Sequence, residues 1–121
     1  MHYMILIYED ESVYGDKNDT PEMQAIVAKH WDLVNELGDQ YKTGAGLAMT
    51  SSATTVRTVN GKQTIHDGPF AETREQLGGY YLIEAPNLDA AMNIAERIPV
   101  AKVGTIEIRP VLEIAGLPSE N

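Results

Sequence analysis

Asp67 is the residue whose type and position most favour chemistry. It ends a short strand-like run and is followed directly by Gly68 and Pro69. Loops at strand ends carry function more often than core segments do, and a carboxylate partly shielded by Phe70 and by nearby tyrosines is suited to act as an acid or base. The alternative is structural, because an Asp at such a turn also accepts backbone N–H bonds from the residues after it. We predict Asp67 as a catalytic residue.

His30 is the second catalytic candidate. Imidazole changes its protonation state near neutral pH, which suits it to proton transfer. His30 lies near the centre of an apolar stripe that runs at helical spacing from Pro21 to Tyr41, with Trp31 on its flank, so we expect its side chain to face the core. A single His in such a stripe is more often a hydrogen-bonded core residue, and this alternative stays open.

Further polar and aromatic residues are expected to line a cleft around these two. Tyr80 and Tyr81 must point to opposite faces of a strand, so one of them should line the cavity. The charged residues could instead form an exposed turn or pair with each other, and His66 could be a surface residue of a hairpin. The predicted lining residues are Phe70, Glu72, Arg74, Tyr80, Tyr81, Arg109, Glu107 and His66.

Composition restricts the classes of function. The 121 residues carry a formal charge of -9 and include no cysteine, which excludes disulfides and thiolate chemistry. A surface of this sign repels nucleic acid. No apolar run is long enough to cross a membrane and no signal peptide is recognisable, so a cytoplasmic location is expected. No phosphate-binding glycine motif or metal-ligand spacing occurs, and we expect a cleft without a metal or cofactor.

The elements that must position these residues follow from periodicity and from turn residues. Asn60-Gly61 between two strand-like runs favours a tight hairpin, in which Val56 would pair with Ile65 and Thr55 with His66. The residues from Glu9 to Asp19 are expected to form a polar loop. The predicted elements are strands at 2–8, 47–50, 54–59, 62–67, 80–84 and 105–114, and helices at 21–41 and 88–98.

This order predicts an α+β fold, namely the ferredoxin-like split βαβ sandwich with an inserted β-hairpin. Two helices can cover only one face of its sheet. The other face would carry apolar side chains beside Glu107 and Arg109, and such a mixed face is not expected to stay in water. Packing two such faces together would bury the apolar part and enclose a lined cavity. We therefore expect a homodimer, a dimeric α/β-barrel.

The segment from Asp67 to Glu84, DGPFAETREQLGGYYLIE, strongly resembles the signature of the DGPF proteins in the YCII-related superfamily. The similarity extends to the first strand, the Asn60-Gly61 hairpin, Ile98-Pro99 and Arg109-Pro110, and so covers nearly the whole chain. It implies one domain over residues 1–115, followed by a tail at 116–121. Ala45 departs from the pattern, because relatives commonly have an acidic residue there.

The resemblance implies a dimeric ferredoxin-like barrel with a polar cleft, but no single reaction. More distant relatives include dehalogenases in which a His and an Asp are the suspected active pair, and His30 lies at roughly that histidine's position. The leading hypothesis is an enzyme without a cofactor that performs elimination, isomerisation or hydrolysis on a polar or anionic small molecule. Some members adjoin extracytoplasmic-function sigma factors, so the alternative is a ligand-binding or regulatory dimer that works with a sigma factor.

Overall fold

A computed structural model describes residues 1–15 and 20–113 of the chain. Its first half contains β1 (His2–Glu9), η1 (Glu11–Tyr14), α1 (Pro21–Leu37), η2 (Gly38–Gln40), β2 (Tyr41–Gly46) and η3 (Thr50–Ser52), where η marks a 3-10 helix. Its second half contains β3 (Thr54–Val59), β4 (Lys62–Asp67), β5 (Gln76–Glu84), α2 (Leu88–Ala95) and β6 (Gly104–Pro110). The predicted tail, residues 116–121, lies outside the described residues. The predicted extension of the last strand beyond Pro110 is wrong, because β6 ends there, and Ile114 itself lies outside the described residues.

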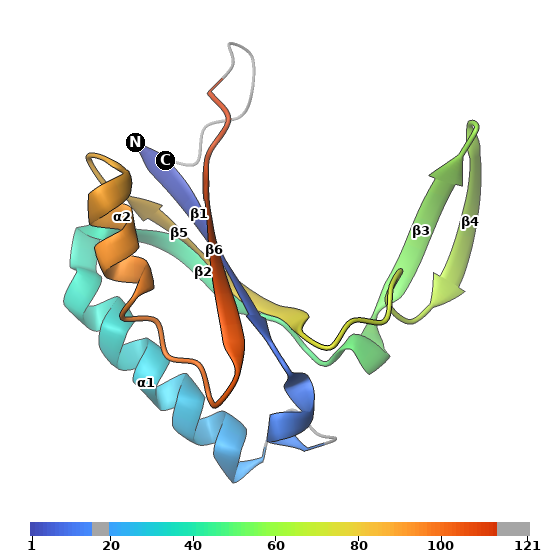
Figure 1. Ribbon diagram of the computed structural model, residues 1–121, viewed down its shortest axis with the longest axis horizontal. Coiled ribbons are helices and arrows are strands. Elements are labelled where there is room, and N and C mark those ends of the chain that lie inside the picture. Colours follow the sequence, from blue (N-terminus) through green and yellow to red (C-terminus); the bar gives the residue numbers. More distant parts are fainter. Residues whose placement is uncertain (16–19, 114–121) are drawn as a thin grey trace.

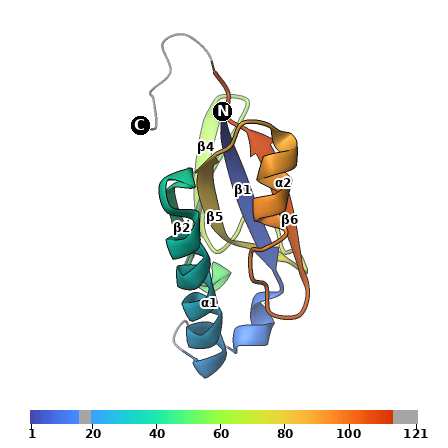
Figure 2. The same cartoon turned by 90° about the vertical axis from the view of Figure 1, so that its left-hand side faces the viewer.

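Four strands form one antiparallel sheet in the order β2-β5-β1-β6. Both helices lie on the same face of this sheet (Figures 1 and 2). This is the predicted ferredoxin-like α+β plan, and it is confirmed. The opposite face, which we call the open face, has no helix over it.

The core lies between the sheet and the helices, and strict alternation along β1 builds it. Tyr3, Ile5 and Ile7 point toward the helices and are buried, whereas the residues between them are only partly buried. Ile83 stands opposite Tyr3 on β5 and is fully buried. The helices contribute Leu33, Leu37, Ala91, Ile94 and Ala95 to the same cluster.

Helix α1 begins where the sequence predicts and ends earlier. The Thr20 hydroxyl accepts a hydrogen bond from the Met23 N–H, and Pro21 occupies the first turn. The predicted continuation to Tyr41 is wrong, because Gly38 adopts a φ of 56° after Leu37 and ends the helix. Tyr41 instead begins β2 and packs against the core from that strand.

The predicted strand at 47–50 is also wrong, because the fourth strand of the sheet is formed earlier, by β2. Strand β5 begins at Gln76, four residues before the predicted start, and includes Gly78 and Gly79. Helix α2 starts after its predicted cap, Asn87, and ends at Ala95 rather than Ile98. Ile98 nevertheless stays buried in the turns that follow.

The hairpin of β3 and β4 has the predicted register. Val56 pairs with Ile65 and Thr55 with His66. The two turn residues have positive φ values, 51° at Asn60 and 78° at Gly61, as a turn of the I′ type requires. These strands form a separate two-stranded sheet that projects away from the body of the molecule on the side opposite the helices (Figure 1). We call residues 54–67 the hairpin arm.

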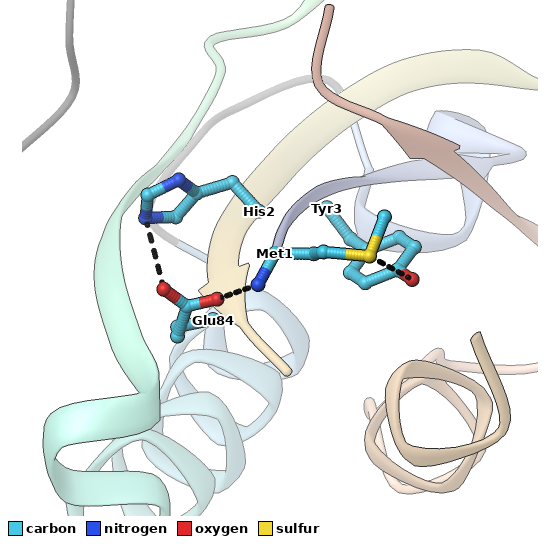
Figure 3. A network of polar contacts seen from close by, with 4 residues as sticks. All are labelled: Met1, His2, Tyr3 and Glu84. Carbon is cyan, nitrogen blue, oxygen red and sulfur yellow. Dashed lines mark hydrogen bonds and ion pairs between the residues drawn. The ribbon is translucent and has the colours of Figure 1, made fainter. Parts of the chain in front are cut away.

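The start of β1 is tied to the end of β5 by a small polar network (Figure 3). The Met1 amino group donates a hydrogen bond to the Glu84 carboxylate, and His2 Nε2 lies 3.6 Å from the other carboxylate oxygen. The hydrogen bond from the amino group is the main cause of a lowered pKa at Glu84. The network joins the two central strands at this end of the sheet.

Two glycines of β2 give a matched test of how tightly this edge strand packs. A Cβ at Gly44 would lie 2.5 Å from the Tyr80 carbonyl oxygen, whereas a Cβ at Gly46 would meet nothing within 4 Å. We expect Gly44→Ala to lower the free energy of unfolding by about 1–3 kcal/mol, and Gly46→Ala by less than about 1 kcal/mol. Chemical denaturation measures both, and equal effects would contradict the packing described.

Candidate functional site

Two adjoining pockets lie between α1 and the strands β2 and β5. The larger, which we call the helix-side pocket, has a volume of about 220 Å³, and the smaller one about 100 Å³. Five residues line both pockets: Glu9, Val27, His30, Gly46 and Gly78. The two hollows therefore meet at a histidine and a carboxylate, which makes this the candidate site.

Glycines open the space below α1. The helix-side pocket is lined on the strand side by Gly44, Gly46, Gly78 and Gly79. Gly44 and Gly79 are also required by backbone packing, because an added Cβ would lie within 3 Å of a carbonyl oxygen of the neighbouring strand. Gly46 has no such constraint, so its missing side chain leaves room for a ligand.

His30 reaches into this space from α1. Its Nδ1 lies 2.7 Å from the Tyr81 hydroxyl, and the two rings are 5.7 Å apart at an angle of 60°. Burial lowers the pKa of His30, and the opposing effect of the negative charge on Glu9 is smaller. The imidazole is therefore held in its neutral form near neutral pH, with one nitrogen bound to the tyrosine.

Tyr81 is suited to orient that imidazole. Burial, and to a lesser extent Tyr41, raises its pKa to about 12, so its hydroxyl stays protonated. The rings of Tyr41 and Tyr81 meet edge to face, with their centres 5.4 Å apart. This contact fixes the Tyr81 ring, and with it the position of the hydroxyl that meets His30.

Glu9 is the buried carboxylate of the site, with 9% of its surface exposed. Its Oε2 accepts hydrogen bonds from the Tyr14 hydroxyl and, at 3.2 Å, from the Ala101 N–H. Burial together with Glu9 raises the pKa of Tyr14, which keeps this donor protonated. Glu9 is not among the predicted site residues, because its sequence neighbourhood predicts a polar loop, whereas the structure places it in β1. Extending the alternation of β1 by two residues from Ile7 would have placed it on the buried face.

The rim of the smaller pocket is held by Glu11. Its carboxylate accepts hydrogen bonds from the hydroxyl and the N–H of Thr50, the latter at 3.1 Å. Its own N–H donates to the Gln76 side-chain oxygen at 2.9 Å. These bonds join η1, η3 and the start of β5.

Of the predicted site residues, the structure brings His30 and Tyr81 together. Tyr80 points to the opposite face, as predicted, and lines a hollow of about 230 Å³ on the open face with Met4, Leu6, Thr43 and Leu82. Tyr80 is also among the residues that line the helix-side pocket. On β6, Glu107 accepts a hydrogen bond from the Tyr8 hydroxyl at 3.5 Å, and Arg109 stands opposite Met4. Both belong to the open face, away from His30.

The remaining predicted residues belong to the hairpin arm or to the loop after it. Asp67 is exposed at the end of β4, opposite Thr54, and lines none of the three hollows described. The His66 ring lies 3.4 Å from the Pro69 carbonyl oxygen, and Phe70 is 77% exposed. The side chains of Glu72 and Arg74 are exposed as well. Within one chain, therefore, Asp67 and His30 do not share a pocket.

Two further features concern the described residues only. They contain no group of three or more His, Asp or Glu side chains placed to hold a metal ion. None of the helices in the described ranges is long and apolar enough to span a bilayer.

Comparison with known proteins identifies the family. The YCII-related domain matches residues 1–115. The chain belongs to the YCII-related family. An uncharacterised protein of Rhizobium meliloti is 36% identical to it over 119 residues, with 92% of each chain covered. The resemblance inferred from the sequence is thereby confirmed at the level of the YCII-related family.

The partly buried position of His30 predicts a pH dependence of stability. Because its pKa in the folded protein lies below the usual 6.5, the unfolded chain binds a proton more readily. Above about pH 6.5, His30 should therefore not affect the free energy of unfolding. That free energy should fall as the pH drops from there toward the pKa of His30 in the folded protein. His30→Gln should remove that part of the slope, and the exposed control His66→Gln should keep it. Urea denaturation across this range measures the difference, and identical slopes for wild type and His30→Gln would contradict it.

Proposed function

We propose that this YCII-related protein binds a small organic molecule in the helix-side pocket and that His30 acts there as an acid–base catalyst. The observation that carries the proposal is the neutral imidazole, held by Tyr81 beside the buried carboxylate of Glu9 in a pocket of about 220 Å³. Elimination, isomerisation and hydrolysis all need a proton to be taken and returned, and these reactions fit such a site.

The proton transfer follows from these contacts. The neutral imidazole accepts a proton from the substrate and becomes an imidazolium ion, which the nearby negative charge of Glu9 stabilises. The Tyr81 hydroxyl at Nδ1 sets the orientation of the ring and the available tautomers. The imidazolium then returns the proton to a different atom of the substrate or to the leaving group.

Asp67 belongs to this proposal as a second catalytic group carried by the hairpin arm. Since Asp67 does not line the pocket of its own chain, its participation requires the arm of a second copy or a rearrangement of its own arm. The arm has surface for such a contact. Val56 and Ile65 of the arm are 58% and 72% exposed, and Phe70 in the loop after it is 77% exposed. An isolated two-stranded hairpin is only marginally stable in water, so the arm would gain stability from such a contact.

We extend the proposal to a homodimer joined at the open face, because this face also carries apolar side chains. Met4, Leu6 and Tyr80 on that face are only partly buried, and they surround a hollow of about 230 Å³. A second open face would cover these side chains and would enclose Glu107 and Arg109 in the interface. The exposed arm also supports the alternative of a regulatory dimer, because its apolar residues could dock on a protein partner such as a sigma factor.

The catalytic proposal is tested by a thermal-shift screen of small metabolites against wild type, His30→Gln and Asp67→Asn. A ligand that binds the folded state raises the melting temperature. We expect a wild-type hit to be turned over, with kcat reduced by about a hundredfold or more in His30→Gln. Unchanged turnover in that variant would refute the role of His30, and unchanged turnover in Asp67→Asn would refute that of Asp67. Regulation would be favoured by a stable sigma-factor complex that tolerates both substitutions.

The dimer proposal is tested separately by sedimentation. We expect wild type at micromolar concentration to sediment at twice the chain mass of 13.3 kDa. Leu6→Glu, which places a charge at the centre of the open face, should sediment as a monomer with an unchanged circular dichroism spectrum. Met92→Glu, an exposed position on α2, is the control and should remain dimeric. A monomeric wild type would refute the proposal.

A further inference from the structure

We propose that the occupant of the helix-side pocket is a small organic cation, with its ammonium group beside Glu9 and its apolar part against Trp31 and Tyr41. This inference rests on the proposed function only in placing the ligand in that pocket. The charge of this ligand is opposite to that of the anionic substrate considered in the hypothesis from the sequence. Four features of the pocket carry it: its charged groups, the free side of the carboxylate, its aromatic wall and the charge of the whole chain.

The charged groups of the site have one sign. Among the described residues that line the helix-side pocket, Glu9 is the one with a full charge near neutral pH, because His30 is held neutral. The smaller pocket adds Glu11, another carboxylate. Neither set of lining residues includes a Lys or Arg. An anionic ligand would therefore meet a buried negative charge with no cation to offset it, at a high cost in free energy.

Within the described residues, one oxygen of the Glu9 carboxylate is left for a ligand. The hydrogen bonds that these residues make to it, from the Tyr14 hydroxyl and the Ala101 N–H, both end on Oε2. A Cβ added at Gly78 would lie 3.9 Å from Oε1 of Glu9. Gly78 lines both pockets. A glycine at this position leaves the approach to Oε1 clear. A protonated amine could donate there and to His30 as well.

The wall of the pocket suits the apolar part of such a ligand. Trp31 is 63% exposed although it faces the pocket from α1, next to Val27 and Val34. Tyr41 and Tyr81 line the opposite, strand side. The face of an aromatic side chain attracts a cation, and it also packs against a flat ring of a ligand. The carboxylate and the aromatic side chains thus favour the same class of ligand.

The charge of the whole chain acts in the same direction. With a net charge of -9, the protein attracts small cations and repels small anions over several ångströms. Such attraction is weak and not confined to one site, so a test must separate it from binding beside Glu9. Glu36 provides that control, because it is an exposed carboxylate of α1 that pairs with Arg97 outside the pocket.

Three probes of nearly the same shape test the sign of the ligand: benzylammonium, benzyl alcohol and benzoate. We expect isothermal titration calorimetry to show benzylammonium binding at least about tenfold more tightly than either of the others, as one charge-assisted hydrogen bond would provide. Gly46→Val, which fills open space in the pocket, should abolish binding of benzylammonium. Equal or tighter binding of benzoate, or no binding of any probe at millimolar concentration, would overturn the inference.

Two variants assign the preference to a residue. Glu9→Gln keeps an acceptor for the Ala101 N–H but removes the charge, so it should bind benzylammonium and benzyl alcohol about equally. Glu36→Gln should keep the wild-type preference. If Glu9→Gln kept the preference for benzylammonium and Glu36→Gln lost it, the preference would come from general surface charge. That result would overturn the inference. If Glu9→Gln does not fold, as judged by circular dichroism, the wild-type comparison and Gly46→Val decide the question.

The result is separable from the catalytic proposal. A preference for benzylammonium together with unchanged turnover in His30→Gln would support the cation site and refute acid–base catalysis by His30. Tight binding of benzoate together with loss of turnover in His30→Gln would refute the cation site and support the catalysis.

Discussion

Two helices can cover only one face of a four-stranded antiparallel sheet, and the rest of this structure depends on that constraint. The covered face holds the core of Tyr3, Ile5, Ile7 and their partners. The open face keeps Met4, Leu6 and Tyr80 only partly buried. The hairpin arm, projecting on that same side, adds apolar side chains that no described part of its own body covers (Figure 1). The proposed dimer follows from this imbalance between apolar area and helices.

The candidate site arises where the covered face is incompletely filled. Four glycines in β2 and β5 line this space from the strand side and add no side chains to it. Into the resulting space come a histidine from the helix and a glutamate from the last position of β1. Burying both groups requires partners, and Tyr81, Tyr14 and the Ala101 N–H supply them. The site is thus a polar end of the core rather than a cleft added to the surface.

Local patterns predicted most of the elements. Asn60-Gly61 predicts the hairpin register correctly, and Thr20-Pro21 the start of α1. The errors arise where long-range packing decides, because Tyr41 continues the helical stripe by type but packs into the core from a strand. The same limit applies to the site. His30 could be selected from the sequence, whereas its contact with Tyr81, across 51 residues, depends on strand register.

The proposed positive charge of the ligand depends on Glu9. The hypothesis drawn from the sequence is a polar or anionic substrate in a cleft that two arginines help to line. Arg74 and Arg109, the positive residues once predicted to line the cleft, lie in the loop after the arm and on the open face, and neither lines the pocket that contains His30. The described charge within that pocket is negative and buried. A ligand that neutralises it gains most when water is excluded, since the attraction strengthens as the local dielectric constant falls.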